Sequence, residues 1–394
     1  MKKTVRDIDV SGKRVLLRVD YNVPLDPSSG GILDDSRIRA TLPTIDYLRQ
    51  RGARVILASH LGRPKGRDPD LSLWPVAERL QKLIDSPVKT TGCCVGPLVQ
   101  EMAHALEPGD LLLLENLRFH EEEDVNDTEY AKALASLAEV FVNDAFSAAH
   151  RAHASTVGVA RFIPAVAGLL MEKEIQHLSR AVTSPEHPFA AVIGGAKISS
   201  KIRVLKNLID RVDKLLIGGG MANTFLKAEG FQVGESLVED DHLEEARQIM
   251  ADAQRRGVAL LLPADVIVAE RLASDSPTQR VAVKNVPPGW RIVDIGDTTL
   301  DVFAKALEGC RTVIWNGPMG VAEIPAFAHG SHRLAAVVSA LPAATTIVGG
   351  GETAAIVEAL GYHDRFSHVS TGGGATLEFL EGRELPGVAA LLNA

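Results

Sequence analysis

Arginine, histidine, asparagine and aspartate side chains recur in the first half of the chain, in short segments that follow apolar runs. Guanidinium groups recognise carboxylates and phosphates through paired hydrogen bonds, so several of them around one crevice indicate a ligand with several anionic oxygens. A surface salt bridge explains most single arginines, and a structural role explains most lone histidines such as His60. The prediction therefore depends on the segments sharing one face of one sheet. They are Arg18–Pro24, Asp35–Arg39, Ser59–Pro64, Glu115–His120 and Ala149–His153.

Three glycine triplets occur in the second half, and the first two directly follow apolar runs: Gly218–Gly220, Gly349–Gly351 and Gly372–Gly374. A strand that ends in glycine lets the backbone approach a ligand, and the following helix points unpaired N–H groups and its positive dipole end at that ligand. We therefore expect phosphate at these turns. The first triplet also predicts a flat slot for an adenine base, although tight packing of helix on strand explains it equally well.

Lys197 and Lys201 follow the run Phe189–Ile193 and a glycine turn, at a spacing of i and i+4. In a helix this spacing places both ammonium groups on one face near the first turn, where lysine has the wrong charge for the helix dipole. A bound anion would remove the conflict, and the alternative is that both lysines are merely solvated. The segment has neither the P-loop spacing nor the glycine fingerprint of dinucleotide-binding proteins.

Glu352 stands at the predicted start of a helix, directly after Gly349–Gly351. A carboxylate there can cap the helix. It can equally hold a Mg²⁺ ion that bridges nucleotide phosphates, because magnesium typically takes one or two carboxylates plus phosphate oxygens and water. The segment Ser370–Glu378 repeats the strand, glycine and helix pattern. Two converging helix N-termini would form a preorganised site for a phosphoryl group in transfer.

Short apolar runs alternate along the chain with longer amphipathic stretches, which is typical of parallel strands that are covered on both faces and linked by helices. We predict the α/β class, with two doubly wound parallel-sheet (Rossmann-like) domains joined by a helix and a cleft between them. The joining helix is predicted from Gly168–Leu178, and the breaker-rich Ser184–Pro188 closes it. The predicted strands are Arg14–Val19, Arg54–Ala58, Asp110–Leu114, Val140–Val142, Phe189–Ile193, Lys214–Ile217, Ala259–Leu262, Thr312–Trp315 and Thr345–Val348.

The length of 394 residues exceeds the size at which one hydrophobic core keeps growing, which favours two domains. A net charge of −8 argues against nonspecific binding to nucleic acid. The cysteines, Cys93, Cys94 and Cys310, are too few and badly spaced for a zinc site or a disulfide framework, which fits a reducing compartment. We find no signal peptide and no run of about 18 apolar residues, so we expect a cytoplasmic protein with no membrane span.

The order of these segments resembles the phosphoglycerate kinase family over essentially the whole chain. A match to any one of these short segments is weak evidence for the family, whereas the whole set in this order is specific to it. The matching strings are Arg18–Pro24, Ser59–Pro64, Glu115–Phe119, Val142–Phe146, His150–Ser155, Gly194–Lys201, Gly218–Asn223, Trp315–Gly320 and the two C-terminal glycine triplets.

The resemblance implies reversible, Mg²⁺-dependent transfer of a phosphoryl group from 1,3-bisphosphoglycerate to ADP, giving 3-phosphoglycerate and ATP in glycolysis, with no covalent intermediate. Arg37 and Lys197, with Gly350 and Gly373 at two helix N-termini, would surround the moving phosphoryl group. The residues that would bind the glycerate substrate are Asp20, Asn22, Arg37, His60, Arg63, Arg118 and Arg151. The residues that would bind the nucleotide are Gly195, Lys201, Gly218, Gly219, Glu323, Gly349, Gly350, Gly351, Glu352 and Thr353, with Glu352 as metal ligand and Glu323 at the ribose.

By the same resemblance the chain is expected to be a monomer with four parts. Residues 1–168 form an N-terminal 3-phosphoglycerate-binding domain, 169–183 an interdomain helix, 184–371 a C-terminal nucleotide-binding domain, and 372–394 a segment that returns to the first domain. Two positions depart from the family pattern. Glu352 stands where aspartate is common, which keeps the carboxylate, and Ser200 stands where an aspartate often separates the two lysines.

Three alternative functions remain open from the residues alone. A kinase for another small carboxylate such as acetate is the closest, but several arginine clusters suit a substrate with charge at both ends better than a small monoanion. A nicotinamide-dependent dehydrogenase shares the fold class but lacks its fingerprint here. A noncatalytic binding protein with two domains would need only one ligand.

Overall fold

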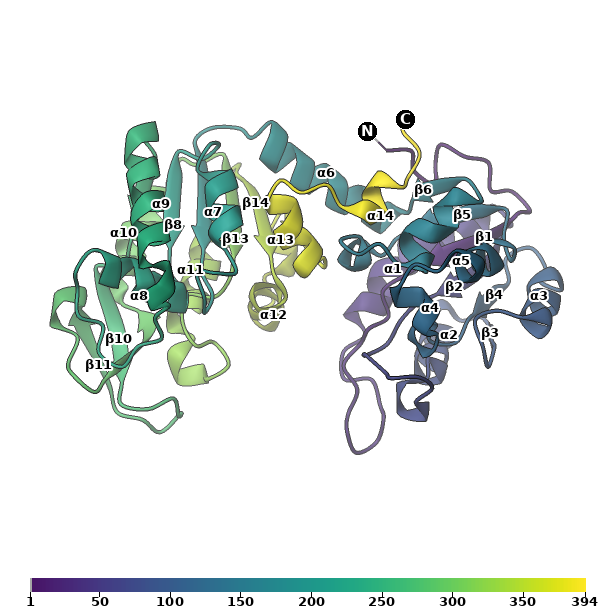
Figure 1. The fold of residues 1–394 in the computed structure, drawn as a ribbon, viewed down its shortest axis with the longest axis horizontal. Helices are drawn as coiled ribbons and strands as arrows, with labels where there is room; N and C mark the ends of the chain where they lie inside the picture. Colours follow the sequence, from purple (N-terminus) through teal and green to yellow (C-terminus); the bar gives the residue numbers. More distant parts are fainter. Residues whose placement is uncertain (1) are drawn as a thin grey trace. The chain divides into compact units, whose positions relative to one another are not determined.

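The structure is a computed structural model that describes residues 2–394, and the chain divides into two compact units (Figure 1). The N-terminal unit comprises the residues up to Gln176 together with Glu384–Ala394, and the C-terminal unit comprises His177–Arg383. The division falls within helix α6, Leu169–Thr183, so this helix contributes residues to both units. No helix among the described residues is long and apolar enough to cross a bilayer.

The N-terminal unit is built on a parallel sheet of six strands in the order β3-β4-β2-β1-β5-β6. Its strands are almost wholly apolar because both faces of the sheet are covered: Leu16 and Leu17 point to opposite faces, and both are fully buried. The strands are β1 Arg14–Arg18, β2 Arg54–Ala58, β3 Val88–Thr90, β4 Leu111–Leu113, β5 Val140–Asn143 and β6 Ala165–Ala167.

Helices cover this sheet and supply the rest of its core. Ile45 of α1 and Leu80 of α2 belong to one buried cluster with Leu17 and Leu57 of the sheet, so α1 and α2 pack on the same face. The helices are α1 Ser36–Gln50, α2 Trp74–Ile84, α3 Pro97–His104, α4 Glu121–Asp124 and α5 Thr128–Ala135.

The last residues of the chain complete the N-terminal unit (Figure 1). After helix α14, Pro386–Ala389, the N–H of Leu392 donates to the carbonyl of Ala165 in β6 at 2.9 Å. The N–H of Lys3 donates to the carbonyl of Leu392 at 2.8 Å. The two ends of the chain therefore lie side by side next to β6.

The C-terminal unit is built on a second parallel sheet of six strands, in the order β15-β14-β13-β7-β8-β9. Trp315 in the central strand β13 is fully buried, in one cluster with Phe303 of α10 and Leu334 of α11. The strands are β7 Phe189–Ile193, β8 Lys214–Ile217, β9 Ala259–Leu261, β13 Thr312–Asn316, β14 Thr345–Gly349 and β15 His368–Val369. The helices are α7 Ile202–Leu208, α8 Gly219–Ala228, α9 Leu243–Arg256, α10 Asp297–Leu307, α11 His329–Ser339, α12 Gly351–Ala359 and α13 Gly374–Leu380.

A smaller antiparallel sheet of three strands, in the order β11-β10-β12, lies in the C-terminal unit between β9 and α10 in the sequence. It comprises β10 Asp265–Ala269, β11 Thr278–Ala282 and β12 Arg291–Ile295. Its core side is a separate cluster that includes Val266 and Val268 with Leu226 of α8. The small sheet thus extends the C-terminal unit beyond the parallel sheet.

The predicted fold class is confirmed, and every predicted strand is present to within one residue at each end. The sequence prediction missed β3, β6, β15 and the whole antiparallel sheet. Strands β3, β6 and β15 have only two or three residues, and β11 carries exposed polar residues, so these four lack the longer continuous apolar run that marks a strand buried on both faces. Strand β10 does carry such a run, Val266–Ala269, and was overlooked.

Candidate active site

Adjacent strands β4, β2, β1 and β5 of the N-terminal unit end at the same edge of their parallel sheet. The segments from which an anion site was predicted come after the ends of these strands in the sequence. Asp20 follows β1, His60 follows β2, Arg118 follows β4 and Arg151 follows β5, while Arg37 lies in the first turn of α1. The strand order therefore brings together side chains from segments that are far apart in the sequence.

Arg18, the last residue of β1, lies beneath this edge and is only 1% exposed. Its Nε donates to Ser155 Oγ at 2.8 Å, and its Nη2 lies 3.2 Å from Nδ1 of His60. Burial, and then the positive charge of Arg18, lower the pKa of His60 well below its ordinary value. Because arginine can only donate, the neutral His60 accepts at Nδ1 and carries its proton on Nε2. That N–H is available to a ligand oxygen.

Asp20 anchors the Arg37 side chain at the same edge. Its carboxylate forms an ion pair with Arg37 and accepts hydrogen bonds from Ser147 Oγ and from the N–H of Asn22, the last at 3.0 Å. Burial alone would raise the pKa of Asp20, but the charge of Arg37 and these hydrogen bonds lower it below its usual value. The ionised Asp20 thus orients a guanidinium that remains 36% exposed. Asn22 in turn accepts from the N–H of Gly62 at 2.8 Å.

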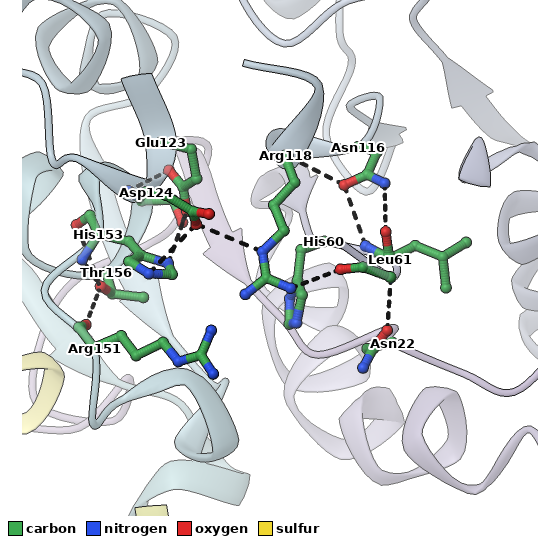
Figure 2. Close-up of polar contacts among 12 residues, drawn as sticks. Asn22, His60, Leu61, Asn116, Arg118, Glu123, Asp124, Arg151, His153 and Thr156 are labelled. Atoms are coloured by element: carbon green, nitrogen blue, oxygen red, sulfur yellow. Dashed lines mark hydrogen bonds and ion pairs between the residues drawn. The ribbon is translucent and has the colours of Figure 1, made fainter. Parts of the chain in front are cut away.

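Arg118 lies among charged side chains of both signs (Figure 2). Its Nη1 donates to the carbonyl of Gly62 at 2.7 Å, whereas its enclosed Nε finds no hydrogen-bond acceptor among the described residues. Burial lowers the pKa of Arg118, and the positive charges of Arg151 and Arg63 lower it further, although Asp124 opposes them. Figure 2 shows the ion pair between Arg118 Nε and Asp124 Oδ1, which lie 3.6 Å apart. The charges of Arg63 and Arg151 that act on Arg118 nevertheless indicate an anionic ligand.

Sequence reasoning missed Glu123 and gave His153 no role. Glu123 is fully buried. Its carboxylate accepts two hydrogen bonds from Ser155, one from the backbone N–H at 3.0 Å and one from the hydroxyl Oγ at 2.5 Å. Burial raises its pKa, against the opposing charge of Arg18. Burial also lowers the pKa of His153 to about 4. A run of glutamates after His120 is more often a solvated helix face, so only tertiary packing reveals this buried carboxylate.

In the C-terminal unit, the glycine turns follow adjacent strands β14, β13, β7 and β8. A cavity of about 410 Å³ opens beside them. Of the predicted nucleotide residues, its walls contain Gly195, Gly219, Glu323 and Glu352.

The first triplet shows the tight packing that was one of its two interpretations, and its place beside the cavity leaves the other, a slot for a base, as a prediction. Gly219 has a φ of +67°, and a Cβ there would lie 2.6 Å from the nitrogen of Gly195 and 2.7 Å from the carbonyl oxygen of Pro318. Gly218 is packed as closely against the Met319 sulfur, 2.4 Å from a built Cβ. Gly219 and Gly220 also line the cavity. Tight packing and a flat cavity wall are therefore consequences of the same missing side chains.

The two lysines do not share a helix face, so this interpretation of their spacing was wrong. Helix α7 begins only at Ile202, Lys201 is its N-cap residue, and Lys197 lies in the preceding turn. Lys201 reaches Oδ1 of Asn316, whereas Lys197 is exposed and its charge acts on Glu239. Burial lowers the pKa of Lys201 to about 8, against the raising effects of Glu352 and Glu381.

Asn316, at the end of β13, is a site candidate to which the sequence assigned no role. It is 1% exposed, its Oδ1 accepts from Lys201, and its Nδ2 has no hydrogen-bond partner among residues 2–394. The Nδ2 atom lies 3.0 Å from a Cβ built on Gly349 and 3.3 Å from one built on Gly350. A buried amide donor without an acceptor is costly, so this atom indicates a ligand oxygen beside the second glycine turn.

The second and third triplets lie close together. A Cβ built on Gly349 would also lie 3.0 Å from the Thr376 methyl group, so the first turn of α13 packs near the start of α12. Thr353 in α12 accepts from the N–H of Gly317 at 2.8 Å, which ties this helix to the end of β13. Gly350 and Gly373 occupy the N-cap positions of α12 and α13 and carry φ values of +89° and +52°.

The residues present fit a Mg²⁺ ion that is shared with a phosphate ligand. No group of three or more histidine, cysteine, aspartate or glutamate side chains in the described part of the chain could hold a metal by itself. Glu352 offers one exposed carboxylate in the first turn of α12, on the cavity wall. One carboxylate completed by phosphate oxygens and water is a typical donor set for magnesium.

Comparison with known proteins identifies one family over nearly the whole chain. The family described as phosphoglycerate kinase matches residues 5–383. The chain belongs to the phosphoglycerate kinase family. The phosphoglycerate kinase of Moorella thermoacetica is 56% identical over 391 residues, covering 99% of each chain. That of Chloroflexus aurantiacus is 55% identical over 398 residues, covering 100% of this chain and 99% of the relative.

Solved structures of the family share the fold. The phosphoglycerate kinase from Coxiella burnetii superposes with a TM-score of 0.89 at 42% identity, covering 99% of this chain and 98% of that one. The enzyme from Pyrococcus horikoshii OT3 gives a TM-score of 0.85 at 33% identity with the same coverage. The family is one of kinases that use ATP and ADP.

Proposed function

We propose that this protein catalyses the reversible transfer of a phosphoryl group from 1,3-bisphosphoglycerate to ADP, giving 3-phosphoglycerate and ATP. The observation that carries this proposal is the position of Arg37, Arg118 and Arg151 after the ends of adjacent strands and at the start of α1, at one edge of the sheet. Burial first, and then neighbouring arginine charges, lower the pKa of Arg118 and of His60, which supports a polyanionic ligand. Family membership and the glycine-lined cavity of the C-terminal unit support the same conclusion.

In this proposal the glycerate substrate binds to the N-terminal unit. Its phosphate is bound by Arg63, Arg118 and Arg151, because a guanidinium group can donate two parallel hydrogen bonds to the oxygens of one phosphate. Asp20, Asn22 and the Nε2–H of His60 position its hydroxyl and carboxyl groups. Arg37, which Asp20 orients, contacts the carboxyl end, where the phosphoryl group is transferred.

The nucleotide binds in the cavity of the C-terminal unit. Its base lies against Gly219 and Gly220, and its ribose hydroxyls donate to Glu323. Lys201 and the amide of Asn316 contact the phosphates, together with the N–H groups at the starts of α12 and α13. When bound, Mg²⁺ neutralises phosphate charge, and Glu352 would hold it. The other residues that we propose contact the nucleotide are Gly195, Gly218, Gly349, Gly350, Gly351 and Thr353.

A loose phosphoryl-transfer transition state needs positioning and charge neutralisation more than covalent help. We propose that Arg37 and Lys197, with the N–H groups that follow Gly350 and Gly373, neutralise the phosphoryl group as it moves in line. Because the substrates bind to different units, the units must approach each other and exclude water, with α6 acting as the hinge. We expect a cytoplasmic monomer.

A coupled assay with 3-phosphoglycerate and Mg-ATP tests the proposal, with acetate and glycerate offered in place of 3-phosphoglycerate. We expect turnover with 3-phosphoglycerate that exceeds turnover with either substitute by several orders of magnitude, because only 3-phosphoglycerate carries charge at both ends. Equal or faster turnover of acetate would support the alternative of a kinase for another small carboxylate.

The affinity for ADP is expected to fall as the pH rises through the pKa of Lys201, which is about 8 in the free protein. Below that pH the lysine is charged and attracts the phosphates, whereas above it the lysine is neutral. Between pH of about 7 and about 9.5 we expect the Kd for Mg-ADP to increase roughly tenfold, the usual worth of a hydrogen bond to a charged group. Isothermal titration calorimetry measures this change.

The matched control is Lys201→Arg, because arginine stays charged across the whole range. Its Kd for Mg-ADP should be nearly independent of pH. An equally steep rise of Kd in this variant would assign the pH dependence to another group.

A further inference from the structure

Arg18, at the end of β1, differs from the other arginines of the N-terminal unit because each of its side-chain nitrogens donates to a protein atom. Its Nε donates to Ser155 Oγ at 2.8 Å, and its Nη2 donates to Nδ1 of His60 at 3.2 Å. Its Nη1 donates to the carbonyl of Val19. Only 1% of the residue is exposed. An arginine enclosed in this way does not reach a ligand itself, so it acts through the residues that it contacts.

Ser155 joins this guanidinium to a buried carboxylate. Its hydroxyl accepts from Arg18 Nε and donates to Oε1 of Glu123 at 2.5 Å, and its backbone N–H donates to Oε2 of Glu123 at 3.0 Å. Because a serine hydroxyl has only one hydrogen to donate, these contacts run in one direction, from Arg18 through Ser155 to Glu123. Ser155 and Glu123 are both fully buried, so water does not compete for these groups.

The segment that carries Ser155 is itself fixed to its neighbours. In the next residue, Thr156 Oγ1 accepts from the N–H of His153 at 3.0 Å and donates to the carbonyl of Arg151 at 2.9 Å. Glu123 and Thr156 therefore hold the position of the Ser155 hydroxyl before any ligand binds. Supporting contacts of this kind are what keep a binding group in one orientation.

The other end of this chain of hydrogen bonds is the His60 ring. An arginine nitrogen can only donate, so Nδ1 of His60 accepts and the proton of the neutral ring is on Nε2. The contact of one ring nitrogen decides which nitrogen carries the proton and how the ring is turned. The position of Arg18 therefore determines which group His60 presents to a ligand.

We propose that Ser155 is a positioning residue for the acidic substrate: through Arg18 it holds the His60 ring so that Nε2–H is the group offered to a substrate oxygen. Without the Ser155 hydroxyl, Arg18 Nε loses its acceptor and Glu123 Oε1 loses its donor at the same time. The charges of Arg18 and Glu123 already act on each other, and opposite charges attract strongly where water is excluded. We expect the guanidinium to turn towards Glu123 and to leave Nδ1 of His60. This inference rests on the proposed binding of 3-phosphoglycerate to the N-terminal unit.

The test compares the wild type with Ser155→Ala by ¹⁵N NMR of the histidine rings and by titration calorimetry with 3-phosphoglycerate. The ¹⁵N shift of Nδ1 reports whether this nitrogen accepts a hydrogen bond, and the signals of His60 are assigned from their absence in His60→Gln. We expect Nδ1 of His60 to accept in the wild type and to be a free acceptor in Ser155→Ala. The Kd for 3-phosphoglycerate should rise about tenfold, the usual worth of a hydrogen bond to a charged group.

The matched control is Thr44→Val, which removes another fully buried hydroxyl of the N-terminal unit. Thr44 Oγ1 accepts from the N–H of Leu169 at 3.0 Å, so the variant also leaves a buried backbone donor without its partner. It should lower the stability of the unit but change neither the Nδ1 shift of His60 nor the Kd for 3-phosphoglycerate. An equal rise of Kd in Thr44→Val would assign the effect of Ser155→Ala to lost stability and overturn the inference.

Two further results would overturn the inference while leaving the proposed function intact. An unchanged Nδ1 shift in Ser155→Ala would mean that Arg18 keeps its place without Ser155. A changed shift with an unchanged Kd would mean that the substrate does not depend on how the His60 ring is held. Failure of the wild type to bind 3-phosphoglycerate would instead contradict the proposed function itself, whereas the NMR comparison would still show whether Ser155 holds Arg18 against His60.

Discussion

Replacing Arg37 by alanine is expected to lower kcat by about a hundredfold to a thousandfold, the usual loss when one preorganised donor to a transition state is removed. Arg37 is more than one third exposed and, within residues 2–394, forms an ion pair with Asp20 alone, so its removal leaves the core intact. The Kd for Mg-ADP should change less than about twofold, because the nucleotide binds in the other unit. Steady-state kinetics and calorimetry measure the two effects separately.

The matched control for this prediction is Arg39→Ala, two residues further along the same helix. Arg39 is 55% exposed and pairs with Asp35 at 2.8 Å, away from Asp20. Its kcat should stay within about twofold of the wild type. A kcat for Arg37→Ala as high as that of Arg39→Ala would remove Arg37 from the transfer step. An effect confined to KM would assign Arg37 to substrate binding instead.

Replacing Arg18 by methionine is expected to lower the free energy of unfolding of the N-terminal unit by about 3–5 kcal/mol, the usual cost of leaving a buried charge unpaired. Arg18 is buried beside Glu123, which is fully enclosed and whose pKa is raised by burial despite the charge of Arg18. Without the guanidinium, the carboxylate of Glu123 keeps Ser155 and, at 3.7 Å, the ring of His153. The pKa of His153 is lowered to about 4, so this ring carries no charge near pH 7 to replace that of Arg18. Hydrogen exchange of the β1 amides, compared with those of β7, reports the loss in the affected unit alone.

The double variant Arg18→Met/Glu123→Gln separates lost packing from unpaired charge. It should recover part of the lost stability, because a neutral amide costs less to bury than a carboxylate. The loss in free energy of unfolding caused by Arg18→Met should also become smaller as the pH falls. The pKa of Glu123 is raised above its unfolded value, so the folded state takes up the proton first and gains stability at lower pH. A double variant no more stable than Arg18→Met would exclude the unpaired charge as the cause.

The residue types and spacings of the sequence were sufficient to predict nine of the twelve parallel strands and the positions of the glycine turns. Runs such as Phe189–Ile193 are apolar on both faces, and an apolar strand of that kind can exist only where both faces are covered. The arginine-bearing segments also follow their strands in the sequence, so their approximate places could be predicted. These are local properties, because each depends on residues that are neighbours along the chain.

Only the tertiary structure decided which side chains meet. The order of the strands brings Arg18 next to His60, Glu123 and Ser155, and it places Lys201 against Asn316 rather than beside Lys197. Burial then lowers the pKa of Lys201 and raises that of Glu123. Such shifts depend on how much water the surrounding segments exclude and which charges they bring within a few ångströms. Residue spacing along the chain does not contain that information, because the segments concerned are separated by tens of residues.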